Sequence, residues 1–357
     1  MSNHFHDVKV LAVEKTTPDC SLVTLDIANG LSEAFAFKQG QYLTLKATID
    51  GEEVQRSYSL CSSPLEGKWQ VGIKKVPGGK FSSYANDQLQ VGDTLQVMEP
   101  NGRFFVEIDP SASRNYVAFA AGSGITPIHS IIKTHLESEP NSTFKLFYVN
   151  QSVGSIILKE EIDALKNRFM QRFEVYHFLT RESRFMPLFD GRLDEDKLEG
   201  IFSKILEIEE IDHVFTCGPE EMIFMVKDFL TGKGLKEDRI HFELFNTSGA
   251  KFAEKHDYSQ ELAGLVSKVT ILEGGKSFNF DIEQGSNNIL DAALQAGADV
   301  PFACKGGVCC TCRAKLMEGE VDMKVNYALE PDEVEKGFIL TCQSIPKSEK
   351  VIVDFDQ

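Results

Sequence analysis

Five of the eight cysteines in this 357-residue chain lie between Cys304 and Cys342, and their spacing is its most specific chemical signal. Three follow the pattern Cys304-x4-Cys309-x2-Cys312, and Cys342 lies far downstream. The other three cysteines are scattered through the rest of the chain. In a reducing compartment, such a cluster indicates metal binding or catalysis rather than disulfide formation.

The spacing resembles that of plant-type [2Fe–2S] ferredoxins, in which three bunched cysteines and one remote cysteine hold the cluster. Soft thiolate ligands suit iron–sulfur chemistry. Gly306 and Gly307 lie between the first two ligands, where glycines let the backbone point N–H groups at sulfur. A four-thiolate zinc site is the alternative, although such sites usually show two close pairs of cysteines in sequence. The predicted cluster ligands are Cys304, Cys309, Cys312 and Cys342.

Cys310 is a fifth thiol inside the same loop, between two predicted ligands. Plant-type ferredoxins usually carry a small residue at this position. We therefore interpret Cys310 as a small-residue substitute and not as a ligand, so that Cys310→Ser should keep the cluster.

The elements around the cysteines predict an α+β domain over residues 266–357. SKVTILEG and KSFNFDI alternate apolar residues as the strands of a hairpin do. A short helix ending at Gly297 precedes the cysteine loop, and further strands follow it. The resemblance implies a β-grasp ferredoxin domain. The polar stretch 249–265 before it predicts a linker.

Two further domains are predicted upstream. Residues 1–110 show short strands with turn signals between them, which is typical of an antiparallel β-barrel. Residues 111–248 alternate strands with helices, which predicts an α/β domain with a doubly wound parallel sheet. The predicted helices are 127–138, 158–169, 194–206 and 219–232.

Two motifs in the barrel, together with the α/β domain that follows, resemble the ferredoxin–NADP reductase superfamily over residues 5–246. The first is the flavin-binding tetrapeptide Arg56-Ser57-Tyr58-Ser59. The resemblance implies that Tyr58 stacks on the isoalloxazine ring, that Arg56 contacts the flavin phosphates, and that Ser59 lies near flavin N5. The second motif is a glycine-rich segment that would bind the pyrophosphate through Gly78, Gly79, Lys80, Phe81 and Ser82.

The loop after the first parallel strand, Gly122-Ser123-Gly124-Ile125-Thr126-Pro127, predicts a phosphate site. Thr126 is a good N-cap and Pro127 a good first helical residue, so the loop would offer a helix N-terminus to a phosphate. In the superfamily this loop meets the nicotinamide dinucleotide, which implicates Gly122, Gly124, Thr126 and Pro127.

The segment Cys217-Gly218-Pro219 follows a later strand and again opens a helix. In the superfamily this loop lies beside the nicotinamide and the flavin, which makes Cys217 a close-packed spacer near the hydride path. Glu243 and Phe245 resemble the superfamily's Glu-x-aromatic segment, which packs beside the flavin and the nicotinamide. The buried end of an ordinary strand would show the same pattern of residues. The predicted catalytic residues are Ser59, Cys217 and Glu243.

The nicotinamide cofactor is predicted to be NADPH. Thr180-Arg181-Glu182 resembles the Ser-Arg-Glu segment that grips the ribose phosphate in NADP-dependent members, and an arginine fork suits a dianion. Asn150-Gln151 at the preceding strand end carries no positive charge, which leaves NADH as the alternative. FAD is predicted over FMN because the glycine-rich segment fits a pyrophosphate, although phthalate-type reductases share the domain order and use FMN.

The composition fits a globular protein, with 42% hydrophobic and 25% charged residues. A net charge of −17 argues against nucleic acid and anionic lipid as partners. The chain has no apolar run long enough to cross a membrane and no secretory signal at its N-terminus. We therefore expect a cytoplasmic location.

The order of flavin, nicotinamide and ferredoxin domains resembles the reductase components of multicomponent oxygenases, in particular those of the phenylacetyl-CoA epoxidase type. The resemblance implies that NADPH gives a hydride to FAD, and that single electrons pass through the [2Fe–2S] cluster to an oxygenase component. The alternatives are a diaphorase without a fixed partner, another hydroxylase reductase, and an iron–sulfur redox sensor.

Overall fold

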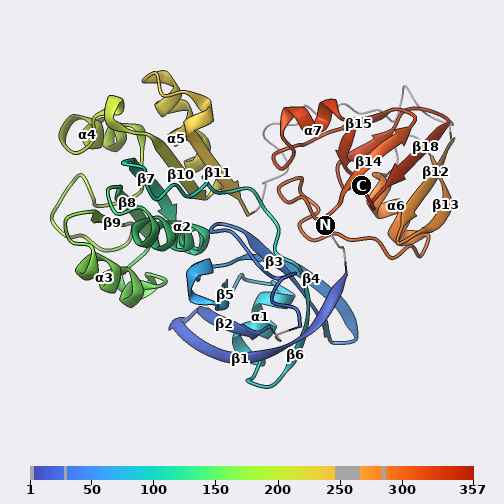
Figure 1. Ribbon diagram of the computed structural model, residues 1–357, viewed down its shortest axis with the longest axis horizontal. Coiled ribbons are helices and arrows are strands. Elements are labelled where there is room, and N and C mark those ends of the chain that lie inside the picture. Colours follow the sequence, from blue (N-terminus) through green and yellow to red (C-terminus); the bar gives the residue numbers. More distant parts are fainter. Residues whose placement is uncertain (1–3, 28–29, 246–265, 284–286) are drawn as a thin grey trace. The chain divides into compact units, whose positions relative to one another are not determined.

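Figure 1 shows the computed structural model of the chain, which describes residues 4–27, 30–245, 266–283 and 287–357. These residues divide into two compact units. One unit holds nearly all of residues 5–245, and the other holds the C-terminal part from residue 266 onward. The predicted linker 249–265 lies outside the described residues.

The first sheet has six strands in the order β4-β3-β6-β1-β2-β5, and its central pairings are antiparallel. Asp50 and Gly51, with φ of 53° and 81°, form the tight turn between β3 and β4. An antiparallel bridge between Leu60 and Val71 joins the end of β4 to β5, so the sheet curls onto itself. Its elements are β1 (Phe5–Thr17), β2 (Cys20–Asp26), β3 (Tyr42–Ile49), β4 (Glu52–Ser59), the 3-10 turn η1 (Pro64–Glu66), β5 (Trp69–Lys74), α1 (Lys80–Asp87) and β6 (Thr94–Met98).

The second sheet has five parallel strands in the order β11-β10-β7-β8-β9, which confirms the predicted doubly wound fold. The strand order reverses between β7 and β10, and the crevice at such a switch point is where α/β sheets bind ligands. The strands are β7 (Asn115–Ala121), β8 (Thr143–Asn150), β9 (Phe173–Leu179), β10 (His213–Gly218) and β11 (Ile240–Leu244). The helices are α2 (Ile125–Ser138), α3 (Lys159–Arg168), α4 (Glu195–Lys204) and α5 (Glu220–Gly232).

The barrel and the parallel sheet share one apolar core. In Figure 1, α2 and α3 lie on one side of the parallel sheet and α4 and α5 on the other. Buried residues alternate along β7, so that Tyr116 and Ala118 pack in the core with α2 and α3, and Val117 and Phe119 pack with α4 and α5. The first of these cores also contains barrel side chains, namely Cys20, Leu22, Cys61 and Phe104. Because interiors are close-packed, a shared core holds the two domains in one arrangement.

The carboxylate of Glu139 is completely buried in this unit. Glu139, at the C-terminal end of α2, accepts hydrogen bonds from the Tyr116 hydroxyl at 3.0 Å, the Ser142 hydroxyl at 2.8 Å and the Asp109 amide at 3.1 Å. The two hydroxyls donate to Oε2, whereas the Asp109 amide donates to Oε1, which also lies 3.1 Å from His135 Nδ1. Burial by itself raises the pKa of Glu139, but the contact with His135 and the other donors outweigh it and lower the pKa to about 2.

The C-terminal unit has a five-stranded mixed sheet in the order β13-β12-β18-β14-β16. β12 and β18 are parallel, whereas the other pairs are antiparallel. The predicted hairpin and the short helix before Gly297 are both present, and Gly297 has a φ of 88° just past the helix end. The elements are β12 (Val266–Glu273), β13 (Lys276–Glu283), α6 (Ile289–Gln295), β14 (Arg313–Glu318), β15 (Val321–Met323), α7 (Pro331–Glu335), β16 (Phe338–Leu340), β17 (Ser344–Pro346) and β18 (Lys350–Asp354).

Candidate redox sites

Strand pairing brings the remote Cys342 to the cysteine loop. Cys312 directly precedes β14, and Cys342 follows β16 two residues after its end. Because Arg313 pairs antiparallel with Leu340, both cysteines lie at the same end of the two strands. The Thr341 amide donates to the Cys312 carbonyl at 3.1 Å, and the Cys312 and Cys342 thiols are hydrogen-bonded to each other.

The other two predicted ligands form a second pair, with 3.1 Å between the sulfurs of Cys304 and Cys309. In the described part of the chain, no three His, Cys, Asp or Glu side chains gather as around a single metal ion. The four cysteines instead form two pairs, which suits the two irons of a four-thiolate [2Fe–2S] cluster. The residues present therefore fit the cluster.

Backbone amides point at these sulfurs, as the glycines in the loop predict. The Gly306 amide donates to Cys304 Sγ at 3.3 Å, and the Gly307 amide donates to Cys342. Gly307 has a φ of 72°, and a Cβ there would lie 2.8 Å from the Val325 carbonyl oxygen, so only glycine fits. The pKa of Cys304 is lowered to about 6 despite the burial of its thiol. The largest cause is the hydrogen bond from the Cys309 thiol, and the backbone amides of the loop add to it. The loop is thus built to carry negative charge on sulfur.

Cys310 makes a different contact from those of its neighbours. Its thiol donates to the Ala328 carbonyl at 3.1 Å, and the residue is half-buried against the core of the C-terminal unit. This contact favours a packing role for Cys310, and its exclusion from the ligand set stays a prediction.

The two flavin motifs of the barrel lie side by side. Tyr58 on β4 and Phe81 on α1 have ring centroids 5.6 Å apart, although they are 23 positions apart in sequence. Phe81 is buried and Tyr58 is half-buried. Arg56 and Ser57 precede Tyr58 on the same strand, and Arg56 is exposed, with one guanidinium nitrogen 2.7 Å from the Gln55 carbonyl.

The glycine-rich segment becomes the N-terminus of α1, as a pyrophosphate site requires. Gly79 is the N-cap, and Gly78 before it has a φ of 73°. The Ser82 hydroxyl accepts from the Val76 amide at 3.1 Å and so folds the segment back on itself. Lys80, which the motif assigns to the pyrophosphate, forms an ion pair with Glu52.

The three predicted catalytic residues meet where the barrel contacts the parallel sheet. The Ser59 hydroxyl donates to the Glu243 carboxyl at 2.9 Å, although the two residues are 184 positions apart. Cys217 on β10 pairs with Glu243 on β11 in the strand register. Burial of the carboxyl raises the pKa of Glu243 to about 8, and the bond from Ser59 only partly offsets this effect. Burial also raises the pKa of Cys217 well above its usual value, so this residue is a neutral thiol.

The loop after β7 differs in one respect from the prediction. α2 begins at Ile125 with Gly124 as its N-cap, because the 3-10 turn η2 (Gly122–Gly124) runs directly into the helix. Thr126 is therefore not the N-cap but lies in the first turn, where its hydroxyl donates to the Ser123 carbonyl at 3.0 Å. Pro127 remains in the first turn, where a missing N–H costs nothing.

Two close approaches explain the glycines of the switch-point loops. A Cβ on Gly124 would lie 2.1 Å from the Cys217 carbonyl oxygen. A Cβ on Gly218 would lie 2.9 Å from the Ala121 Cβ. At Gly124 the obstacle is backbone, so this loop packs directly against the backbone at the carboxyl end of β10, whereas at Gly218 the nearest atoms belong to the side chains of Met222 and Ala121. Pro219 is the N-cap of α5, and Phe245 packs against the shared core.

One positioning residue has no signature in the sequence. The hydroxyl of buried Tyr148 on β8 donates to the Gly122 carbonyl at 3.0 Å and contacts the Ile157 carbonyl at 3.3 Å. Tyr148 thereby ties the first glycine loop to the segment before α3. In sequence it is only one more apolar position of a buried strand.

The predicted ribose-phosphate segment lies at the same carboxyl edge. The Thr180 amide donates to the Asn150 carbonyl at 2.9 Å, and the Arg181 amide donates to the Gln151 carbonyl at 2.8 Å. These bonds hold the segment beside the end of β8, with the side chain of Arg181 exposed.

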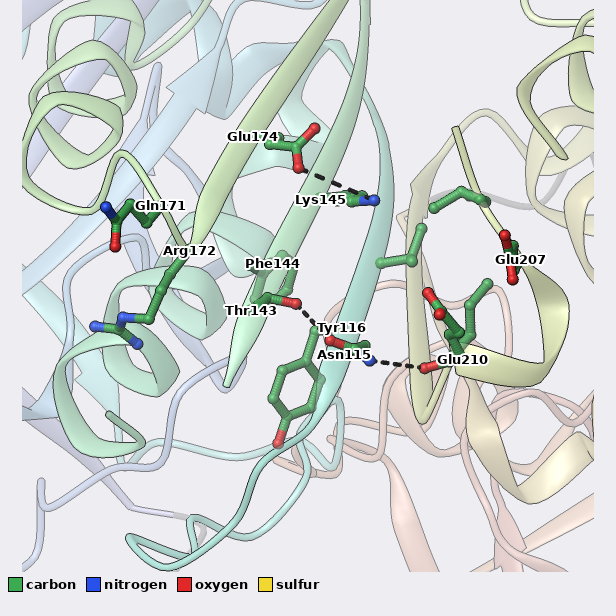
Figure 2. A pocket seen from close by; sticks show the side chains of 13 residues that line it. Asn115, Tyr116, Thr143, Phe144, Lys145, Gln171, Arg172, Glu174, Glu207 and Glu210 are labelled. Carbon is green, nitrogen blue, oxygen red and sulfur yellow. Dashed lines mark hydrogen bonds and ion pairs between the residues drawn. The ribbon is translucent and has the colours of Figure 1, made fainter. Parts of the chain in front are cut away.

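A cavity of about 220 Å³ lies at the opposite edge of the parallel sheet (Figure 2). Asn115 and Thr143, the first residues of β7 and β8, line it and are hydrogen-bonded to each other. Across it the Asn115 amide group donates to the Glu210 carbonyl at 3.1 Å, and Lys145 lies 3.9 Å from Glu174. The predicted nicotinamide-site residues of this sheet are at its carboxyl edge, and no predicted site residue lines the cavity.

Comparisons with known proteins agree with the three-domain arrangement. Residues 7–106 match the oxidoreductase FAD-binding domain, residues 119–228 the oxidoreductase NAD-binding domain, and residues 271–347 the 2Fe-2S iron-sulfur cluster binding domain. No helix among the described residues is long and apolar enough to span a membrane. Relatives at least 30% identical along almost the whole chain are components of oxygenase systems, so the chain belongs to the family of modular reductases that join FAD-, NAD- and [2Fe–2S]-binding domains and serve as the reductase components of oxygenases.

Particular relatives cover almost the whole chain. A 1,2-phenylacetyl-CoA epoxidase subunit from Escherichia coli K12 is 40% identical over 99% of this chain and 98% of its own length. The ferredoxin reductase component of 3-ketosteroid-9-alpha-monooxygenase from Rhodococcus rhodochrous is 32% identical over 97% and 95%. The solved structure of phthalate dioxygenase reductase shares the fold, with a TM-score of 0.60 and 23% identity over 98% of both chains.

Proposed function

We propose that this protein takes a hydride from NADPH and delivers single electrons to an oxygenase component, with phenylacetyl-CoA epoxidase as the first candidate partner. When bound, FAD accepts the two electrons of the hydride together and the [2Fe–2S] cluster carries them onward singly. The 40% identity to one subunit of that epoxidase along nearly the full chain supports the choice of partner.

The observation that carries the proposal is the Ser59–Glu243 hydrogen bond beside Cys217. It joins the end of the flavin tetrapeptide to the carboxyl edge of the nicotinamide sheet. We propose that Ser59 lies beside flavin N5 and that Glu243, with its raised pKa, holds a proton there at neutral pH. Cys217 and Phe245 then shape the space in which the two rings meet.

The remaining site residues hold the cofactors in this proposal. Tyr58 would stack on the flavin ring, Arg56 would contact its phosphates with Ser57 beside it on the strand, and the N-terminus of α1 would bind the pyrophosphate through residues 78–82. The helix N-termini after β7 and β10 bind the dinucleotide through Gly122, Gly124, Thr126, Pro127, Gly218 and Pro219. Four thiols, Cys304, Cys309, Cys312 and Cys342, hold the cluster.

We propose NADPH over NADH because Thr180 and Arg181 are held at the carboxyl edge of the sheet, where the adenosine ribose is expected. The domain extents that we propose are 1–110, 111–248 and 266–357. A cytoplasmic location is supported by the eight cysteines, none of which forms a disulfide.

The test starts from the purified holoprotein under anaerobic conditions. Extracted flavin is identified by chromatography, and kcat/KM is measured for NADPH and for NADH. NADPH is then used to drive a purified phenylacetyl-CoA epoxidase through this reductase. Turnover of the epoxidase supports the proposal. Rapid reduction of small acceptors without epoxidase turnover would indicate a diaphorase or another hydroxylase reductase, and no bleaching by NADPH would indicate a redox sensor.

A further inference from the structure

One face of α2 is hydrogen-bonded to residues 60–66, the segment that directly follows β4. Ser130 Oγ donates to the Ser62 carbonyl at 2.6 Å, and His129 Nδ1 lies 2.7 Å from the Cys61 carbonyl. All four residues are at most 5% exposed. Because a carbonyl only accepts, Nδ1 carries the proton, and burial lowers the pKa of His129 so that the ring stays neutral.

The row of contacts continues one turn further along the helix. The Thr134 hydroxyl donates its proton to the Ser130 carbonyl at 2.6 Å. The Ser63 hydroxyl, 2.8 Å from the Thr134 hydroxyl, must therefore be the donor in the contact between these two. Both Thr134 and Ser63 are buried. Ser130 and Thr134 are four residues apart and so lie on one face of the helix, and His129 directly precedes Ser130. We call these three residues, His129, Ser130 and Thr134, the α2 seam.

The α2 seam joins the two motifs that the proposed reaction needs. The 60–66 segment starts immediately after Ser59, and α2 starts immediately after the Gly122–Gly124 turn. The helix that would hold the dinucleotide at its N-terminus is therefore bound side-on to the continuation of the flavin tetrapeptide. Lys133 and Glu66 add an ion pair beside the seam. A row of directional hydrogen bonds adds to the packing of the shared core, because each bond requires a defined distance and angle between α2 and the 60–66 segment.

We infer that the α2 seam sets the position of the nicotinamide relative to the flavin, which makes His129, Ser130 and Thr134 positioning residues for hydride transfer. This inference rests on the proposed function. Hydride donor and acceptor must approach to about 3–3.5 Å, and a misplacement of about 1 Å can cost about 100-fold in rate. A seam of this kind therefore controls the rate at saturating NADPH more than it controls NADPH affinity.

The test compares variants of the holoprotein that alter hydroxyl groups on α2. Ser130→Ala and Thr134→Val, alone and combined, remove seam hydroxyls with little change of volume. Thr134→Ser keeps the hydroxyl, and Ser138→Ala makes the same chemical change at the half-buried last residue of α2, outside the seam. Anaerobic stopped-flow absorbance gives the flavin bleaching rate at saturating NADPH, the NADPH Kd and the amplitude of the long-wavelength charge-transfer band.

We expect bleaching in the double variant to slow at least about fivefold, and the charge-transfer band to weaken, while the Kd changes less than about twofold. Thr134→Ser and Ser138→Ala should behave as wild type. Unchanged bleaching and an unchanged band in the seam variants would overturn the inference, and so would a loss confined to flavin content or Kd. If the double variant does not fold, the single variants decide by the same criteria. A wild-type protein that NADPH does not bleach would overturn the proposed function itself.

Discussion

Replacing Gly124 by alanine should disable the nicotinamide site while leaving the flavin site intact. The added Cβ would lie 2.1 Å from the Cys217 carbonyl oxygen, 2.5 Å from its carbon and 2.9 Å from the Gly218 nitrogen. All three are backbone atoms of β10, so no side chain can turn away to make room. The loop must therefore move by about 1 Å, at a cost of ~1–3 kcal/mol in the free energy of unfolding.

The functional effect should exceed the effect on stability. A shift of about 1 Å at a reacting centre can cost about 100-fold in rate, so kcat/KM for NADPH with ferricyanide as acceptor should fall by about that factor. Flavin content, measured from the visible absorbance, should not change, because Gly124 belongs to the nicotinamide domain.

Gly154→Ala is the matched control for this experiment. Gly154 lies in a 3-10 turn of the same domain (η3, Val153–Ser155), and a Cβ there would meet no atom within 4 Å. This variant should keep wild-type kcat/KM. If Gly124→Ala also stays within about twofold of wild type, the backbone contact between the two loops does not position the dinucleotide, and the reasoning fails.

Three further predictions concern separate parts of the chain. Cys310→Ser should keep the visible iron–sulfur absorption, whereas Cys309→Ser should lose it. Loss of the absorption in both variants would show that Cys310 is a ligand. Glu139 has a pKa of about 2 in the folded protein, against 4.5 in the unfolded chain. Its ionised form therefore contributes up to about 3 kcal/mol to the free energy of unfolding, and this contribution is complete above pH 4.5 and is lost as the pH falls toward 2. Chemical unfolding should therefore show Glu139→Gln to be less stable at neutral pH and less sensitive to acid, and parallel curves would contradict this. Arg181→Ala should lower kcat/KM for NADPH by about 10- to 100-fold and leave that for NADH unchanged, because it removes a charged hydrogen bond to the ribose phosphate. An equal loss with both nucleotides would show that Arg181 does not discriminate between them.

Local patterns in the sequence were enough to predict which segments form helices and strands and what kind of chemistry the chain supports. The period of apolar residues is a property of neighbouring positions, so the four helices of the parallel sheet were predicted to within two residues at each end. The cysteine spacing works in the same way, because three of the four predicted ligands lie on one short loop whose geometry the glycines define. The exception was the start of α2, where Gly124 rather than Thr126 is the N-cap. A 3-10 turn leads into the helix there, and its path depends on the backbone of β10.

Contacts between distant positions were decided only by the tertiary structure. The pairing of Cys312 with Cys342 depends on the register of β14 against β16, and the Ser59–Glu243 bond spans 184 positions. The role of Tyr148 and the α2 seam were not visible beforehand, because a buried serine, threonine or tyrosine looks the same in sequence whatever it binds. A hydrogen bond needs a partner at a defined distance and angle, and only the packing of elements that are distant in sequence supplies those partners.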